Sequence, residues 1–204
     1  MLGKLVLLSL LAYALSQCID RVNNTVDIAD DANVNNNVIF QNAVGATYDN
    51  NSNPSCYKGV ANLKFPGILG LVSGTVVVNQ ANDFDNNTKI LLTLIKNDHL
   101  LGTVCKDGKS QTIFVPDKDC SIAFCTKEES LCKALSSPGT YTLGELEGDA
   151  GIGSTINLPN VSNDIKPLLK GQWKVELKFQ TGSGNIVAGL IIPSNDNGWL
   201  YIEE

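Results

Sequence analysis

The stretch Gln172–Gln180, QWKVELKFQ, alternates apolar and polar side chains over its whole length. Successive side chains of an extended strand point to opposite faces, so Trp173, Val175, Leu177 and Phe179 share one face and the charged residues share the other. Period-two alternation predicts a β-strand with one buried and one hydrated face. Such a strand is typical of an antiparallel sheet that is covered on one side.

Short apolar segments of strand length recur along much of the remaining chain, separated by Gly, Pro and Asn. Lys89–Lys96, KILLTLIK, places Ile90, Leu92 and Leu94 on one face. The link 181–185, TGSGN, predicts a hairpin loop whose glycines adopt positive φ. Eight or so such strands with turns between them predict an all-β sandwich or barrel. The other predicted strands are Gly74–Asn79, His99–Val104, Gln111–Val115, Thr140–Leu146, Gly153–Leu158 and Ile186–Ile192.

Length and composition restrict the classes of protein and partner. A chain of 204 residues with 43% hydrophobic and 18% charged residues fits one packed domain, with at most a small appendage. The net charge of −6, without a Lys/Arg cluster, argues against nucleic acid and anionic lipid surfaces as partners.

The N-terminus indicates the compartment. Met1–Ser16 has one basic residue, Lys4, and then the apolar run Leu5–Leu15, too short for a membrane span of roughly 20 residues. We expect a secretory signal peptide rather than a membrane anchor, and a mature chain that begins near Gln17. Four glycosylation sequons agree with secretion: they begin at Asn23, Asn50, Asn86 and Asn160.

The cysteine count fits the same compartment. Six cysteines, an even number in an oxidising environment, predict a disulfide framework with fifteen possible pairings. A zinc site would need Cys-x-x-Cys pairs or histidine partners, and His99 is the only histidine, so we expect no metal. The cysteines are Cys18, Cys56, Cys105, Cys120, Cys125 and Cys132.

The N-terminal part of the mature chain differs in composition. Between Cys18 and Cys56 there are ten Asn, five Asp and one basic residue, Arg21. Such a segment is too polar for a core of its own, and we expect a loop-rich appendage, with a disordered arm as the alternative. The expected organisation is a signal peptide at 1–16, an Asn-rich loop-like segment at 17–57, a β-sandwich domain at 58–193 and a tail at 194–204.

Patterns for catalysis or cofactor binding are weak. His99 follows a turn-like Lys-Asn-Asp sequence, and a nucleophilic triad would need a base beside its nucleophile. Glu145 and Glu147 could form a carboxylate pair, but a solvated strand edge explains them better. The glycines of 148–154 lack the order of a phosphate loop, and 83–88 lacks the turn glycine of a calcium loop. We therefore expect a binding protein without a cofactor, and not an enzyme.

A series of short motifs runs in order between Val72 and Ile192. The motifs are 72–78 VSGTVVV, 89–94 KILLTL, 103–105 TVC, 119–120 DC, 124–125 FC, 138–143 PGTYTL, 158–159 LP, 169–176 LKGQWKVE, 183–184 SG and 190–192 LII. In this order and with this cysteine placement, the chain resembles the ML (lipid-recognition) domain family, most closely its sphingolipid-activator members.

The resemblance implies a disulfide pairing and also shows departures from the family. It pairs Cys105 with Cys120 and Cys125 with Cys132, and leaves Cys18 and Cys56 to each other. Gly189 stands where the activators carry a cysteine bonded to the N-terminus. The apolar loop 159–171 lacks the exposed tryptophan of the activators, and its sequon at Asn160 would place a glycan where they touch a membrane.

The resemblance further implies an immunoglobulin-like β-cup, two antiparallel sheets with an apolar cavity that holds acyl chains. The expected function is a secreted or lysosomal lipid-binding protein that transfers a lipid or glycolipid, or presents it to a hydrolase as an accessory factor, with transient contact to a membrane surface. The alternative is an extracellular recognition or adhesion sandwich with a filled core. The expected lining residues are Val76, Val78, Ile90, Leu92, Leu94, Trp173, Val175, Leu177, Phe179, Leu190 and Ile192, with Leu158, Ile165, Leu168 and Leu169 near the mouth.

Overall fold

The computed structural model describes residues 18–126, 129–143, 145–146, 155–158, 160, 166–195 and 198–203. The expected signal peptide, 1–16, lies outside these residues. Within the described part of the chain, none of the helices has the length and apolar character that crossing a membrane would require.

The first sheet is antiparallel and is built around two long strands. β2 pairs with β1 on one side and with β5 on the other. β10 and β11 both pair with the free edge of β5, near its two ends. The strands are β1 (Thr25–Asp30), β2 (Val38–Asp49), β5 (Gly67–Val78), β10 (Gly139–Thr142) and β11 (Thr155–Leu158).

The second sheet is centred on β12, which pairs antiparallel with β13, β6 and, at its start, β14. β6 also pairs with β7 and β9, and β7 with β8. β14 continues in parallel to β4, which pairs with β3. The strands are β3 (Cys56–Tyr57), β4 (Val60–Leu63), β6 (Lys89–Lys96), β7 (Thr103–Lys106), β8 (Lys109–Ser110), β9 (Ser121–Ala123), β12 (Gly171–Gln180), β13 (Ile186–Ile192) and β14 (Leu200–Ile202).

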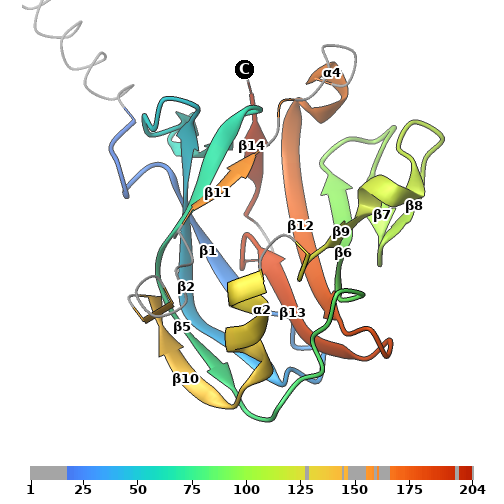
Figure 1. Cartoon of the computed structure of the whole chain (residues 1–204). Coiled ribbons are helices and arrows are strands. Elements are labelled where there is room, and N and C mark those ends of the chain that lie inside the picture. Colours follow the sequence, from blue (N-terminus) through green and yellow to red (C-terminus); the bar gives the residue numbers. More distant parts are fainter. Residues whose placement is uncertain are drawn as a thin grey trace, which may run out of the picture.

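One strand joins the two sheets. The first part of β1 pairs with β2, whereas Ala29 and Asp30 pair with Ile191 and Leu190 of β13. The sheets are therefore closed along this edge and face each other as a β-sandwich (Figure 1). The helical segments are η1 (Asp117–Cys120), α2 (Glu129–Ser136) and α4 (Lys166–Leu169), and Figure 1 shows α2 in front, between β10 and β9. The all-β fold class predicted from the sequence is confirmed.

The disulfides agree with the pairing that the family resemblance implies. Cys105 is bonded to Cys120 and Cys125 to Cys132, and Cys18 is bonded to Cys56. The first of these bonds closes the loop that carries β8 and η1.

Most of the predicted strands are present, although two are much shorter than predicted: His99–Leu101 form a turn before β7, and β10 ends at Thr142, before a helical turn. β6 and β13 have the predicted bounds, and β12 begins one residue earlier than expected. Residues Gln111–Val115 are not a strand, because the short β8 ends at Ser110 and bends follow. The loop 181–185 links β12 to β13 as expected, but of its two glycines only Gly184 has a positive φ, at 91°.

The segment 17–57 is not loop-like, as the composition suggested, because it supplies β1 and β2 to the first sheet. Its Asn residues lie largely in turns, where their side chains bind backbone groups; Asn36 accepts a hydrogen bond from the Gly189 amide at 2.7 Å. The tail 194–204 likewise contains β14, which pairs with β12 and β4. Both segments are therefore part of the sandwich.

Candidate functional site

The inner side chains of β12 differ in their exposure to solvent from one end of the strand to the other. Trp173 and Phe179, near its two ends, are 4% and 6% exposed. Val175 and Leu177 between them remain partly exposed, although β12 is paired on both sides there with β6 and β13. The backbone of a central strand is covered by its neighbours, so this exposure indicates that solvent reaches the inner face of the sheet between the two buried ends.

The neighbouring strand β6 continues this accessible surface. Leu94 pairs with Val175 and Leu92 with Leu177, and both leucines are also partly exposed. We call Leu92, Leu94, Val175 and Leu177 the central wall.

The first sheet has a matching accessible region. Gly45 pairs with Val26, a buried inner residue, so Leu71, which also pairs with Gly45, lies on the inner face. Leu69 lies on the same face, since a Cβ atom at Gly45 would be 3.5 Å from its Cδ1 atom. Both leucines are partly exposed. The side chains of Val26 and Leu69 close over Gly45, where a Cβ atom would lie 3.2 Å from the Val26 Cγ1 atom and 3.5 Å from the Leu69 Cδ1 atom.

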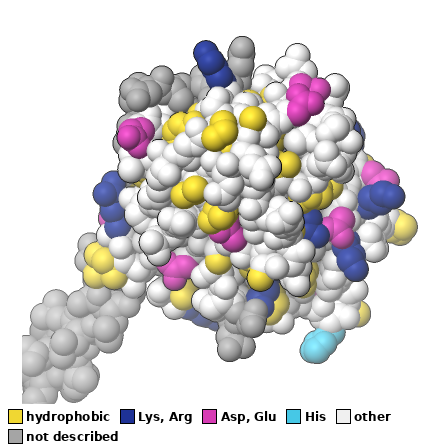
Figure 2. Space-filling model, turned by 90° about the horizontal axis from the view of Figure 1, so that it is seen from below, with side chains coloured by type: hydrophobic (Ala, Val, Ile, Leu, Met, Phe, Trp, Pro, Cys, Tyr) yellow, Lys and Arg dark blue, Asp and Glu magenta, His cyan; other side chains and the backbone are white. Residues whose placement is uncertain are grey.

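The interior is filled at one end. Phe179 lies 5.2 Å from Phe124 and 6.1 Å from Phe40, measured between ring centroids. Val38 and Leu135 complete this cluster, and each is only 1% exposed. Figure 2 views the molecule from below, and the hydrophobic side chains are scattered among polar atoms there. We call this end the closed end.

A separate apolar cluster surrounds Trp173 at the other end. It contains Val104 and the Cys105–Cys120 disulfide, with the partly buried Leu92 and Leu94 of the central wall packed against it. A third cluster contains Val26, Ala61, Ile192 and Leu200, and Val175 and Leu177 of the central wall pack against it. Leu177 also packs against the closed-end cluster, so these two clusters are joined through partly buried side chains.

Helix α4 is fixed to this end by two side chains of the second sheet. The Trp173 indole donates a hydrogen bond to the Leu169 carbonyl at 2.5 Å. The Lys96 ammonium donates one to the Leu168 carbonyl at 2.9 Å and lies 5.7 Å from the centre of the Trp173 ring. A crevice beside α4 is lined by Leu63, Phe65, Leu169 and Ile202, with Lys166, Lys170 and Glu203.

The charged residues of β12 lie on its outer face, away from the central wall. Lys178 donates a hydrogen bond to the Asp107 carboxylate at 2.7 Å, which raises the pKa of Lys178. Burial raises the pKa of Glu176, and the negative charge of Asp31 raises it further. The described inner residues between the two ends are apolar, which suits an uncharged, apolar ligand.

The structure places the predicted lining residues in three environments. Val76, Val78, Trp173, Phe179, Leu190 and Ile192 are buried. Ile90, Leu92, Leu94, Val175, Leu177, Leu158 and Leu169 are partly exposed, and Leu168 is 38% exposed. Ile165 lies outside the described residues. The sequence analysis missed Leu69, Leu71 and Gly45, since their alternation is interrupted by glycines.

The residues considered for catalysis do not converge. His99 is exposed in the loop after β6. Glu145 accepts hydrogen bonds from the amide and hydroxyl groups of Thr142, which lower its pKa, and Glu147 lies outside the described residues. Of the sequon asparagines, Asn50, Asn86 and Asn160 are exposed.

A second hollow lies where β1 passes from one sheet to the other. It has a volume of about 480 Å³ and a mixed lining that includes Asp27, Asp30, Asn42 and Ser194. Burial raises the pKa of Asp30, while a hydrogen bond from the Phe40 amide lowers it. The two carboxylates, Asp27 and Asp30, make it a poorer site for an acyl chain than the central wall, although Ile28, Phe40 and Val44 also line it.

Comparisons with known proteins give likenesses to solved structures alone. No family model matches the chain, and no curated protein matches it. Among solved structures, the crystal structure of chicken MD-1 complexed with lipid IVa matches with a TM-score of 0.30 and 11% sequence identity, covering 82% of this chain and 94% of that one.

Proposed function

We propose that this protein binds the acyl chains of a lipid between its two sheets, along the central wall. The supporting observation is the partial exposure of Val175 and Leu177 in the middle of a strand that is paired on both sides. Leu69 and Leu71 offer apolar surface on the opposite sheet.

The energetics of lipid transfer require such a surface. A lipid with about 28 methylene groups loses about 0.8 kcal/mol for each when it leaves a bilayer. A carrier must therefore supply an interior of comparable apolar character. In this chain the described inner residues of β6 and β12 supply leucine, isoleucine and valine side chains, and the charges of β12 lie on the outer face.

The wider role that we propose is transfer of a lipid or glycolipid, or its presentation to a hydrolase, outside the cell or in lysosomes. The predicted signal peptide, the sequons and the three disulfides support an oxidising, secretory route. Mass spectrometry of lipids extracted from the purified, glycosylated protein would identify the cargo and, with it, the class of any partner enzyme.

A space-filling substitution tests the lipid site. We expect Leu177→Trp to lower the uptake of a monomeric fluorescent fatty acid by the delipidated protein at least about tenfold, because the indole would occupy the volume of the acyl chain. The free energy of unfolding should fall by no more than about 1–3 kcal/mol, the usual cost of overpacking, because Leu177 packs against two hydrophobic clusters but remains partly exposed. Fluorescence titration and urea unfolding measure the two quantities.

The matched control is Lys178→Trp, which adds the same side chain to the outer face of β12. It should leave uptake unchanged, as the Lys178–Asp107 ion pair is at the surface and contributes little. Equal uptake by the Leu177→Trp variant and the wild type would refute the site. A wild-type protein that carries no lipid and takes up none would favour the recognition sandwich with a filled core.

A further inference from the structure

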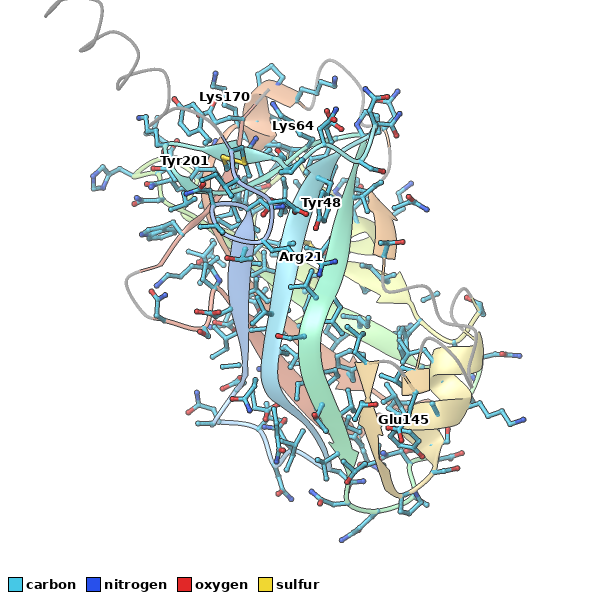
Figure 3. All side chains as sticks on the ribbon, turned by 90° about the vertical axis from the view of Figure 1, so that its left-hand side faces the viewer. Arg21, Tyr48, Lys64, Glu145, Lys170 and Tyr201 are labelled. Carbon is cyan, nitrogen blue, oxygen red and sulfur yellow. A yellow bond between two sulfur atoms is a disulfide. The ribbon has the colours of Figure 1, made fainter. Side chains whose placement is uncertain are left out.

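The hollow beside β1 arises because this strand changes sheets. Ile28 still pairs with Ala43 of β2, whereas the next residue, Ala29, pairs with Ile191 of β13. The first part of β2 therefore pairs with β5 but not with β1, and the hollow of about 480 Å³ lies beside it. Figure 3 faces this side of the molecule, with β1, β2 and β5 side by side and Tyr48 labelled towards the upper end of β2. We call this cavity the seam hollow.

Polar side chains from three segments line the seam hollow. Asp27 and Asp30 belong to β1, Asn42 to β2 and Ser194 to the chain after β13. The Ser194 amide donates a hydrogen bond to the Asp27 carbonyl at 2.9 Å, which holds the third segment beside the first. At Asn42 the pairing of β2 with β5 shifts register, and such bulges turn side chains in a new direction. The fold thus brings together polar groups that are distant in sequence.

The Asp30 carboxylate takes the position of the missing strand partner of β2. It accepts a hydrogen bond from the Phe40 amide at 2.9 Å. Burial nevertheless raises the pKa of Asp30, because its charged form loses part of its hydration. Among the described residues that line the hollow, none is a lysine or an arginine. A bound cation would therefore supply the counter-charge that the lining lacks.

Apolar side chains complete the lining of the seam hollow. Ile28 and Phe40 are partly exposed and also pack against the closed-end cluster. The Phe40 ring lies 6.1 Å from that of Phe179, measured between ring centroids. Val44 lines the same hollow. These contacts give the hollow a preformed apolar floor, against which the body of a ligand can lose its contact with water.

We propose that the seam hollow binds a small organic amine in its protonated form. Its ammonium group would lie between the two aspartates, and its apolar body against Ile28 and Phe40. A primary ammonium has three donors, which two carboxylates and the Ser194 hydroxyl can accept. The volume falls within the range of about 300–1,000 Å³ that is usual for small-molecule sites. This site is separate from the central wall and does not depend on lipid binding.

A metal ion suits the seam hollow less well than an amine. Calcium is bound by oxygen atoms alone, so an apolar floor gives such an ion nothing. The described residues hold no group of three or more His, Cys, Asp or Glu side chains that could bind a metal ion. An amine with an apolar body uses both the carboxylates and the floor of the hollow.

A ligand-observed NMR titration of the full mature, glycosylated protein with 2-phenylethylamine tests the proposal. At about pH 7 this probe carries a positive charge, as a lysine side chain does. We expect a Kd of about 1 mM or tighter. The neutral probe 2-phenylethanol has the same apolar body and should bind at least about tenfold more weakly, because it offers the carboxylates no charge. This comparison is made on the wild type and needs no variant.

The substitution Asp30→Asn should weaken the binding of 2-phenylethylamine at least about tenfold. It removes the charge but keeps an oxygen atom that can accept the hydrogen bond of the Phe40 amide. The matched control is Asp83→Asn, which removes the same charge at an exposed residue outside the hollow. This control should bind the amine like the wild type.

Uptake of the monomeric fluorescent fatty acid measures the lipid site separately. It should be unchanged in the Asp30→Asn variant, and the fatty acid should not displace the amine from the wild type. Equal binding of the two probes would overturn the proposal, as would equal amine binding by the Asp30→Asn variant and the wild type. Displacement of the amine by the fatty acid would place it at the central wall, and displacement by an equal concentration of calcium chloride would identify a metal site. Either displacement would overturn the amine site in the seam hollow.

Discussion

Replacing Phe179 by alanine should lower the free energy of unfolding by about 3–5 kcal/mol. The ring is 6% exposed and packs against Phe124 and Phe40, which belong to segments far apart in the sequence. Its removal leaves a cavity that three different segments would have to close. Urea unfolding at constant m-value measures the loss.

The matched comparison is Leu177→Ala, two residues earlier on the same face of β12. This substitution should cost less, near the lower end of the range of about 2–5 kcal/mol for buried leucines, because Leu177 packs against two clusters but remains partly exposed. A loss equal to that of the Phe179→Ala variant would show that both positions lie in one continuous core. It would also remove the basis of the proposed lipid site.

β6, β12 and β13 each place apolar residues on one inner face, and their bounds follow from the sequence to within one residue. The inner face of β12 was also predictable, because period two assigns Trp173, Val175, Leu177 and Phe179 to one side.

Strands whose apolar residues are small, or whose length is short, were not predictable in this way. β2 buries Ala43, Gly45 and Ala46, which give little hydrophobic contrast beside the many Asn residues. β14 has only three residues and is stabilised by partners on β12 and β4 that are distant in sequence. The composition of these segments therefore suggested loops, whereas pairing with strands that are distant in sequence makes them β-strands.

The state of the interior depends on contacts that no local pattern contains. Phe179 and Leu177 are equivalent in the alternation, but one meets Phe40 and Phe124 and the other stays partly exposed. Phe40 of β2 and Phe124 of the loop after β9 both lie beside Phe179, whereas Leu177 has no ring partner among the described residues. A sequence pattern can thus assign a residue to the inner face without showing whether that face is filled.

Replacing both Cys105 and Cys120 by alanine should also lower the free energy of unfolding by a large amount. The bond closes a loop of 15 residues, which corresponds to about 3 kcal/mol through the entropy of the unfolded chain. Both cysteines are 0% exposed beside Trp173, and the loop between them carries Ile113 and Phe114. We therefore expect a lower free energy of unfolding together with weaker uptake of the monomeric fluorescent fatty acid, because Leu92 and Leu94 of the central wall pack against the cluster that contains this disulfide.

The Cys18–Cys56 disulfide provides the control for this double effect. It spans 38 residues, so its removal should cost about 4 kcal/mol by the same entropy relation, yet neither of its cysteines belongs to the cluster around Trp173. Under conditions in which both variants remain folded, the Cys18→Ala, Cys56→Ala variant should take up the fluorescent fatty acid like the wild type, although it is the less stable of the two. Equal losses of uptake in the two variants would mean that lipid binding follows global stability and not the packing of the central wall.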